Sequence, residues 1–367
     1  MEYGSVLELD NILKYKIPEK ENIIELPFMK GIKDKYQINF YQSGRNAIEE
    51  LYVYLKKQGF RKAIIPDYVC QTVKDAILRA GVEVAEYSVS KDFEYSIEGI
   101  EKFIEEKCSV YICHYFGRPL SSEIIATLRK WKTRGIIVVE DITLSLLSES
   151  KEGIGFGSYV LGSLRKWFPI PDGGFLYSKE HALPMKVNSN SVSNYTNLYL
   201  MVQNLKREYI DGECQDKALK NVYMGYYKQS IEELFSDYKI YPMSEWSYNY
   251  LSNTSVEEII EKRIKNYDRL YNKLGLCEGI ELPDKRVNGF LPFGMVLFAT
   301  DRDNLLEYLI SKNIYCNVHW RLGSKKENPD LEYLSKRIIT IPCDQRYNED
   351  DMDYIASIIR EWSEIYV

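Results

Sequence analysis

A lysine stands in an unusual setting near the middle of the chain. The segment GSLRKWFPIPDGG (162–174) places Lys166 directly before Trp167 and Phe168 and before a turn bounded by proline and glycine. A strongly hydrated ammonium group among apolar neighbours either has its charge paired or keeps its amine for covalent chemistry with a carbonyl compound. The structural alternative is a lysine whose methylene stem covers the two aromatic rings.

A second segment offers a place for a phosphate. In FYQSGRNAIEEL (40–51), Ser43 and Gly44 stand directly before a predicted helix. The free backbone N–H groups of Gly44 and Arg45, together with the positive end of that helix, suit an anion. The Arg45 guanidinium can add a charge-assisted contact, although a plain surface cation is the alternative. Ser163 is a further hydroxyl for the same phosphate.

A third segment supplies a carboxylate. GIIVVED (135–141) has the pattern of a buried parallel strand, and it ends in Asp141. A phosphate site, an acid at the end of a core strand and a sheltered lysine together suit pyridoxal 5′-phosphate (PLP). The aldehyde of PLP needs a lysine, and its pyridine nitrogen needs an acid partner that keeps the ring protonated as an electron sink. The alternative for Asp141 is a helix cap or a surface acid.

Nucleotide cofactors fit the sequence less well. The glycines of GIGFGS (153–158) follow a polar stretch where a strand would be required, and the GxGxxG pattern is incomplete. A GxxxxGK[ST] motif does not occur in the chain. These observations argue against a nicotinamide site and an ATP site.

The elements that must position these groups follow from the hydrophobic pattern between residues 37 and 178. Short β-branched runs alternate there with amphipathic stretches. The predicted strands are 61–66, 82–89, 109–117 and 135–141, and the predicted helices are 46–57, 69–80, 97–106 and 122–133. This alternation predicts an α/β domain with a mainly parallel central sheet flanked by helices. Ligands of such sheets bind beyond the carboxyl ends of the strands.

The C-terminal part of the chain predicts a smaller α+β domain. It begins with a long amphipathic helix over 256–275 and closes with a helix over 350–364. We expect a large domain over 1–250, with a short N-terminal arm over 1–30, and a small domain over 251–367. The polar segment 188–245, rich in Asn and Tyr, receives no assignment.

Composition excludes several classes of protein. A net charge of −6 over 367 residues, without a long basic run, argues against nucleic-acid binding. The seven cysteines are scattered and none has CxxC spacing, which argues against a zinc site or a disulfide framework and favours a reducing compartment. The N-terminus lacks an apolar signal core, and no apolar run approaches the ~20 residues that span a bilayer. We therefore expect a cytoplasmic protein with no metal and no membrane partner.

Several stretches, in this order, resemble one enzyme family. The matching stretches are SGRNAI, IIPDYVCQTV, CHYFGRP, VVEDITLS and SLRKWFPIPDGG, followed by EKRIKNYDRL and IITIPCDQRYNEDDMDYI. They resemble the DegT/DnrJ/StrS family of PLP-dependent sugar aminotransferases, which have the aspartate-aminotransferase-like fold (fold type I). The resemblance implies an enzyme that passes an amino group from an amino acid such as glutamate to a keto sugar, linked to a nucleotide, in surface-polysaccharide or secondary-metabolite biosynthesis. It also implies a homodimer with shared active sites.

The resemblance also implies roles for individual residues. Lys166 matches the lysine that binds the cofactor covalently and then moves protons, and Asp141 matches the partner of the ring nitrogen. The other candidates are Ser163, Gly44, Arg45 and Tyr68 for the cofactor, and His319 and Asp172 for the substrate. An ordinary core tyrosine is the alternative for Tyr68, and a tight turn is the alternative for Asp172. We expect His114 and Glu140 to be structural.

Three departures from the family leave the substrate open. Leu144 stands where the family commonly has Gln or His, SGR replaces SGT, and the interval from Ser163 to Lys166 is shorter. Two alternatives therefore stand beside the sugar aminotransferase: a PLP transaminase of a small non-nucleotide ketone, and a non-catalytic PLP-fold protein that binds or senses. Relatives that remove a sugar hydroxyl carry histidine in place of the lysine, and Lys166 argues against that reaction.

Overall fold

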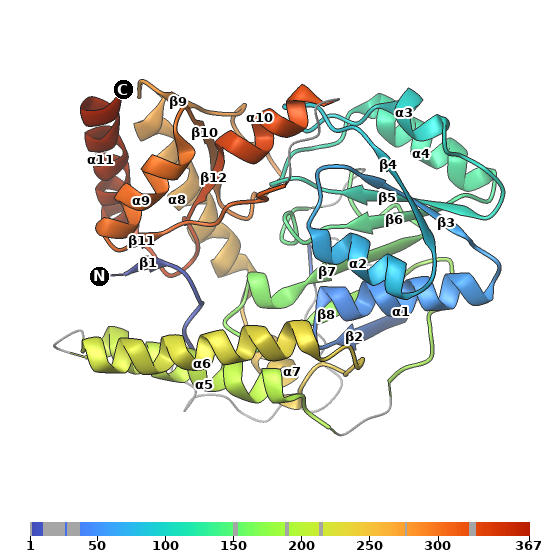
Figure 1. Cartoon of the computed structure of the whole chain (residues 1–367), viewed down its shortest axis with the longest axis horizontal. Coiled ribbons are helices and arrows are strands. Elements are labelled where there is room, and N and C mark those ends of the chain that lie inside the picture. Colours follow the sequence, from blue (N-terminus) through green and yellow to red (C-terminus); the bar gives the residue numbers. More distant parts are fainter. Residues whose placement is uncertain are drawn as a thin grey trace.

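The computed structural model describes residues 2–9, 26–27, 37–149, 153–187, 191–212, 216–275, 277–322 and 328–367. Figure 1 shows three parts of the molecule: a large sheet with its helices, a small domain that carries the C-terminus, and a long helical hairpin that runs beneath both. Among the described residues, no helix combines the length and the apolar composition needed to cross a membrane.

The large domain is built on a seven-stranded sheet. Its strands are β2 (Gln37–Tyr41), β3 (Lys62–Pro66), β4 (Glu83–Tyr87), β5 (Cys108–Cys113), β6 (Ile137–Asp141), β7 (Tyr159–Ser163) and β8 (Gly174–Ser178). The order across the sheet is β2-β8-β7-β6-β5-β3-β4. The strand β8 runs antiparallel to both of its neighbours, β2 and β7, and the other neighbouring pairs are parallel. The predicted α/β architecture with a mainly parallel sheet is confirmed.

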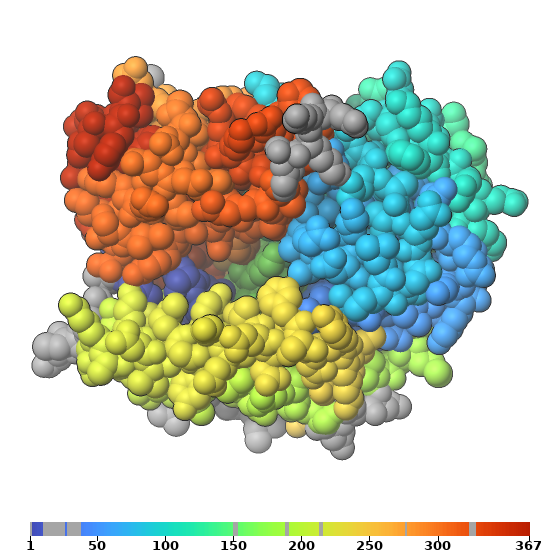
Figure 2. Space-filling view, viewed as in Figure 1, coloured from blue at the N-terminus to red at the C-terminus, as the bar shows by residue number. Residues whose placement is uncertain are grey.

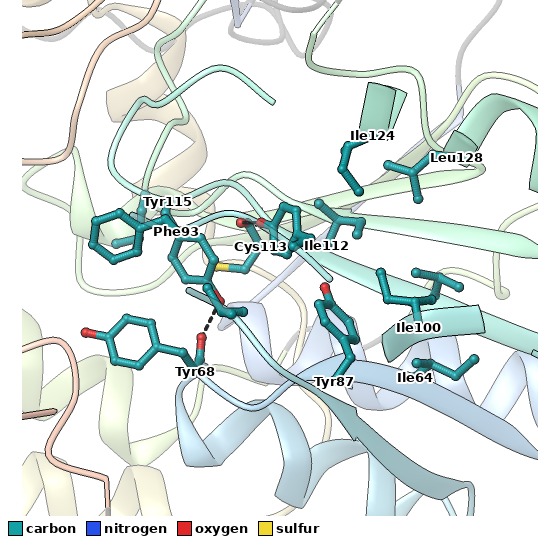
Figure 3. Packing of buried hydrophobic residues seen from close by; sticks show 14 of the residues in the cluster. Ile64, Tyr68, Tyr87, Phe93, Ile100, Ile112, Cys113, Tyr115, Ile124 and Leu128 are labelled. Carbon is teal, nitrogen blue, oxygen red and sulfur yellow. Dashed lines mark hydrogen bonds between the residues drawn. The ribbon is translucent and has the colours of Figure 1, made fainter. Parts of the chain in front are cut away.

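Helices cover both faces of this sheet, and the strands supply apolar side chains to each face in turn. The helices are α1 (Gly44–Lys57), α2 (Gln71–Arg79), α3 (Ile97–Glu101) and α4 (Ser122–Thr133). In β3, Ile64 packs with the residues of α3 and α4, whereas Ile65 packs with those of α1 and α2. Figure 3 shows Ile64 close to Ile100 of α3 in the first of these clusters. A strand that is buried on both faces needs continuous apolar runs, which is the pattern of the sequence here.

The small domain has a three-stranded sheet covered by helices. Its strands are β9 (Ile280–Glu281), β10 (Met295–Ala299) and β12 (Ile338–Ile341), and its helices are α8 (Val256–Leu274), α9 (Arg302–Ser311), α10 (Pro329–Arg337) and α11 (Glu349–Tyr366). The sheet order is β12-β10-β9, with antiparallel pairing. The helices α8 and α11 pack against one another. The predicted small α+β unit and its first and last helices are thereby confirmed.

The segment that the sequence left unassigned is mainly helical. It contains α5 (Asn194–Asp211) and α6 (Lys217–Ser236), which pack side by side, and leads into α7 (Glu245–Ser252). The hairpin has its own core, which is rich in tyrosine: Tyr195, Tyr199, Tyr209 and Tyr223 with Val202 and Leu234. Tyrosine and asparagine have only moderate helix propensity, so these helices depend on packing against each other.

The N-terminal segment ties the hairpin to the small domain. The strand β1 (Tyr3–Gly4) pairs in parallel with β11 (Ile314–Tyr315). Lys206 of α5 is buried beneath this segment, where it donates hydrogen bonds to the backbone oxygens of Gly4 and Val6. Figure 2 shows the blue N-terminal residues inside a recess between the hairpin and the small domain. The remaining residues of the expected arm, 1, 10–25 and 28–30, lie outside the described residues.

Candidate active site

The ends of two neighbouring strands bring together the residues expected to do chemistry. Asp141 is the last residue of β6, and Ser163 is the last residue of β7. These strands are parallel, with Asp141 opposite Leu161, so β7 extends two residues further before the short 3-10 helix η3 (Leu164–Lys166). The carboxyl edge of the sheet therefore places the acid, the hydroxyl and the lysine beside one another.

Asp141 is held in one orientation by two hydrogen bonds. Its Oδ2 accepts from the Tyr111 hydroxyl at 2.7 Å, and its Oδ1 accepts from the backbone N–H of Thr143 at 2.8 Å. Burial and the neighbouring Asp141 raise the pKa of Tyr111 well above its usual value, so its hydroxyl stays protonated as a donor. Asp141 is only 7 % exposed. It lines a cavity at this edge of the sheet.

This cavity, which we call the sheet-end cavity, has a volume of about 200 Å³. Asp141, Ser163 and Lys166 line it from the sheet, and Ser43, Gly44 and Arg45 line it from α1. Its apolar walls include Val69, Leu144, Leu161, Leu234, Phe235 and Trp320. One carboxylate and several cationic or N–H groups thus face a pocket with mostly apolar sides. Such a pocket suits a flat apolar ligand with an anionic group at one end.

The start of α1 forms one end of the sheet-end cavity, and its backbone suits an anion. Ser43 caps the helix, because its Oγ accepts from the backbone N–H of Asn46 at 3.2 Å. The first turn has no acidic residue, and the N–H groups of Gly44 and Arg45 have no partner within the helix. A Cβ on Gly174 would lie 2.2 Å from the Ser43 carbonyl carbon, so glycine there lets β8 support this turn at close range.

Lys166 is presented to the cavity by a turn that is fixed on its other side. The Trp167 indole N–H donates to the Thr143 carbonyl at 2.7 Å, and the backbone N–H of Leu164 donates to Gly173 at 2.9 Å. The Trp167 ring is fully buried and is covered by the Arg263 guanidinium at 4.5 Å. Within the described part of the chain, Lys166 Nζ forms no hydrogen bond and no ion pair. Its amine is therefore available to a ligand.

Tyr68 lies elsewhere than predicted. It is fully buried in the core of Figure 3, where its ring contacts Phe93 and Tyr115. Its hydroxyl donates to the backbone oxygen of His319. Tyr68 does not line the sheet-end cavity. Trp320, which packs against Tyr68, does line it. The stacking role expected of Tyr68 is therefore corrected: it is a core tyrosine, and Trp320 supplies the aromatic wall.

Asp172 is also placed away from the cavity. Its carboxylate accepts from the hydroxyl of Ser244 at 2.8 Å and from the hydroxyls of Ser247 and Thr196. Burial raises the pKa of Asp172, although these hydrogen bonds oppose the shift. The expected substrate-binding role is corrected, because the side chain instead joins the turn after η3 to α5 and α7.

His319 reaches the site from the small domain. It is buried against Phe116, Phe293 and Trp320, and its Nδ1 lies 2.9 Å from the Thr340 hydroxyl. Burial, with a smaller contribution from the charge of Lys166, lowers the pKa of His319 to about 3. The ring is therefore neutral at physiological pH. It contributes a polar edge to the neighbouring cavity.

Glu140 and His114 have structural positions, as expected. Both are fully buried, and His114 Nε2 lies 3.3 Å from Glu140 Oε2. The same carboxylate accepts from the backbone N–H groups of Gly155, at 2.7 Å, and Gly157. Glu140 thus fastens the glycine-containing loop 153–158 to the sheet, and this loop has a structural function.

A second cavity adjoins the first and was not foreseen. It has a volume of about 330 Å³ and lies between the N-terminal segment, the hairpin and the small domain. Because Tyr199, Tyr223, Tyr227 and Tyr315 line it, we call it the tyrosine cavity. Arg165 and Lys166 line both cavities, so they separate one from the other. In the described residues there is no cluster of His, Cys, Asp and Glu that could hold a metal ion.

Comparison with known proteins shows the fold. No protein-family model and no curated protein matches the chain. Solved structures do match: the sugar aminotransferase CalS13 from Micromonospora echinospora is 14% identical, with a TM-score of 0.59, and the alignment covers 88% of this chain and 87% of that one. For a DegT DnrJ EryC1 StrS aminotransferase from Brucella abortus the identity is 15%, the TM-score 0.61 and the coverage 89% and 86%. Spr1654 from Streptococcus pneumoniae, in its PLP form, has 15% identity, a TM-score of 0.64 and coverage of 89% and 87%. The chain has the fold of these aminotransferases, fold type I.

Proposed function

We propose that the protein is a PLP-dependent aminotransferase that passes an amino group from an amino acid to a keto sugar. One observation carries the proposal. The free amine of Lys166 and the oriented carboxylate of Asp141 line one cavity together with the start of α1. The solved structures with the same fold support it, since CalS13 is a sugar aminotransferase and Spr1654 has been solved in PLP and PMP forms.

The residues of the sheet-end cavity fit PLP at each of its chemical groups. The N-terminus of α1 and the Ser163 hydroxyl suit the phosphate. Asp141 suits the protonated ring nitrogen, because a carboxylate stabilises the charged form of a neighbouring base. The apolar walls at Val69, Leu161 and Trp320 suit the faces of the ring. When bound, PLP supplies an electron sink and carries the amino group between the two half-reactions.

The chain's own residues then have separate tasks. Lys166 Nζ first holds the cofactor and, once released, accepts the proton of the donor's α-carbon and later returns a proton to the acceptor carbon. Asp141 keeps the ring nitrogen of the cofactor protonated, and the Tyr111 hydroxyl keeps the Asp141 carboxylate oriented. Leu144, Leu161 and the other apolar walls exclude water from the reacting atoms. Overall, one amino acid and one keto compound become one keto acid and one amino compound.

The acceptor side of the proposal rests on the tyrosine cavity. Hydroxyl and amide groups of Tyr223, Tyr227, Tyr315 and Asn317 line it beside Lys166. Aromatic rings with polar tips suit a sugar, which offers both hydroxyls and C–H faces. We propose a nucleotide-linked keto sugar, with glutamate as donor and a role in surface-polysaccharide or secondary-metabolite biosynthesis, as the resemblance implies.

Assembly and location are part of the same proposal. Phe235 lines the sheet-end cavity and is 50 % exposed, which favours a second copy of the chain that covers it in a closed two-fold dimer. The six described cysteines are all free thiols, which favours the cytoplasm.

The first experiment is borohydride reduction of the purified protein with added PLP, followed by peptide mapping. We expect a phosphopyridoxyl adduct on Lys166, absent from Lys166→Ala. The half-reaction is then followed by the cofactor's absorbance after addition of L-glutamate. An adduct without amine exchange would favour the non-catalytic binding protein. The absence of an adduct on every lysine would refute both the proposed PLP cofactor and the proposed aminotransferase activity.

A further inference from the structure

Arg165 is a partly buried cation that has no acidic partner among the described residues. Its Nε is buried without a hydrogen-bond partner. Among the carboxylates of the described residues, none forms an ion pair with its guanidinium. Other cations of this region do have acidic partners: Arg346 contacts Asp344 at 2.7 Å, and Lys206 lies 3.6 Å from Glu2. Neighbouring tyrosines favour the charged form of Arg165, but they carry no negative charge of their own. A partly buried guanidinium without a counter-ion therefore suits an anion that is supplied from outside.

The surroundings of Arg165 direct its guanidinium toward the tyrosine cavity. Its central carbon lies 5.7 Å from the ring of Tyr199 and 5.8 Å from the ring of Tyr195. Tyr199 lines the tyrosine cavity and does not line the sheet-end cavity. The aromatic rings restrict the side chain, so the fork of N–H donors is held in place before a ligand arrives.

The other cations near this place are already engaged. Lys220 also lines the tyrosine cavity, but its Nζ lies 2.7 Å from the Glu2 carboxylate. In the sheet-end cavity, Arg45 donates to the Leu234 carbonyl, and the start of α1 offers the site for the phosphate. Arg165 and Lys166 are the two unpaired cations that both cavities share.

From this arrangement we infer that Arg165 binds a carboxylate of the amino-acid donor in the tyrosine cavity, an inference that rests on the proposed aminotransferase function. Arg165 and Lys166 are neighbours in the chain and line the same cavity, and an amino acid carries its amine and its carboxylate on one carbon. When the guanidinium of Arg165 binds the carboxylate of the donor, the amine of the donor lies close to Lys166, where the cofactor is proposed to bind. A guanidinium and a carboxylate can form two parallel hydrogen bonds. Arg165 therefore favours amino donors that carry a carboxylate over simple amines.

The test compares three variants in two measurements. Glutarate, a dicarboxylate without an amine, is titrated calorimetrically into wild type, Arg165→Gln, Arg165→Lys and Lys179→Gln, the last at an exposed lysine that lines neither cavity. The half-reaction with L-glutamate is compared with displacement of Lys166 from the cofactor by ethylamine, which has no carboxylate. Thermal unfolding and the borohydride adduct on Lys166 check that each variant is folded and binds the cofactor.

For Arg165→Gln we expect about 100-fold weaker glutarate binding and about 100-fold lower kcat/KM for L-glutamate, the size typical of removing one partner of a buried charge pair. Ethylamine displacement and cofactor affinity should change less than about threefold, since neither involves a carboxylate on Arg165. Arg165→Lys should recover part of the loss, because it keeps the charge but not the fork. Lys179→Gln should leave glutarate binding unchanged, because Lys179 is exposed and lines neither cavity.

Two results overturn the inference. If Arg165→Gln slowed the reactions with L-glutamate and with ethylamine equally, Arg165 would not recognise the carboxylate of the donor. Weaker cofactor binding with unchanged glutarate affinity would assign the guanidinium to the phosphate. The proposed function fails separately, through the absence of the Lys166 adduct in wild type, and glutarate binding is measured without reference to that adduct.

Discussion

The two adjoining cavities are built in different ways. The sheet-end cavity takes its acid, hydroxyl and lysine from residues 141–166, on adjacent strands of one sheet. The tyrosine cavity is assembled from the N-terminus, the hairpin and the small domain, and Glu2 and His319 meet there from opposite ends of the chain. Rigid neighbouring strands suit reacting groups, which need fixed distances. The three parts that line the tyrosine cavity can change in sequence independently of one another, which suits a site that determines substrate specificity.

The comparison is tested most severely at Lys166. If the sheet-end cavity holds the chemistry, Lys166→Ala should lower the rate of amine exchange at least about 1,000-fold, since the same amine holds the cofactor and moves the proton. Absorbance in single-turnover mixing with L-glutamate measures the effect. Lys179→Ala, at an exposed lysine just beyond β8, is the matched control and should behave as wild type. Normal exchange in Lys166→Ala would place the chemistry elsewhere.

Asp141 should have the next largest effect. Asp141→Asn keeps the shape of the side chain but removes its charge, so the ring nitrogen loses the partner that keeps it protonated. We expect about a 100-fold lower rate with little change in stability. Tyr111→Phe removes only the hydroxyl that orients the carboxylate and should cost about tenfold. The two rates, measured on protein with the cofactor bound, would rank in the opposite order if Tyr111 itself handled the proton.

A pH experiment tests whether the N-terminal segment, which lines the tyrosine cavity, buries Lys206. Burial lowers the pKa of Lys206 to about 8, below its value in the unfolded chain. Above pH 8 the unfolded state therefore binds more protons at this site than the folded state, and stability from this group rises with pH until the unfolded lysine titrates. Relative to Lys206→Met, the free energy of unfolding of wild type should gain about 1 kcal/mol per pH unit from about pH 8 to 10.

Urea unfolding at several pH values measures this difference. Lys220→Met is the matched control, because the Glu2 carboxylate and the Tyr315 hydroxyl raise the pKa of Lys220 above its ordinary value despite the opposing effect of burial. Its difference from wild type should stay level between pH 8 and 9. A level difference for Lys206→Met as well would mean that the N-terminal segment does not bury the ammonium group in solution.

The smallest effect is expected at Tyr68. In Tyr68→Phe the ring remains in its core position, and only the hydrogen bond from the hydroxyl to the His319 backbone is lost. We expect a loss of about 1 kcal/mol in stability and less than a threefold change in cofactor affinity. Thermal unfolding and cofactor titration measure the two quantities. A large loss of cofactor affinity would return Tyr68 to the cofactor-binding role that its position in the structure does not support.

The parts of the molecule that could be predicted are those whose pattern is local. The apolar runs that became β3 and β6, and the amphipathic stretch that became α1, carry their periodicity within a few residues. The hairpin α5–α6 could not be recognised, because its core consists of tyrosines whose apolar character appears only when the two helices pack together.

Single residues divide in the same way. The sequence by itself determined that Asp141 and Lys166 stand next to strand ends, and parallel strands bring such ends to one edge of a sheet. Tertiary structure decided the surroundings of Tyr68, Asp172 and Arg165. The His319 carbonyl over Tyr68, the serines around Asp172 and the tyrosines against Arg165 come from segments more than 25 residues away in the chain. No local pattern records such contacts, because burial and pairing depend on which distant surfaces meet when the domains and the hairpin pack.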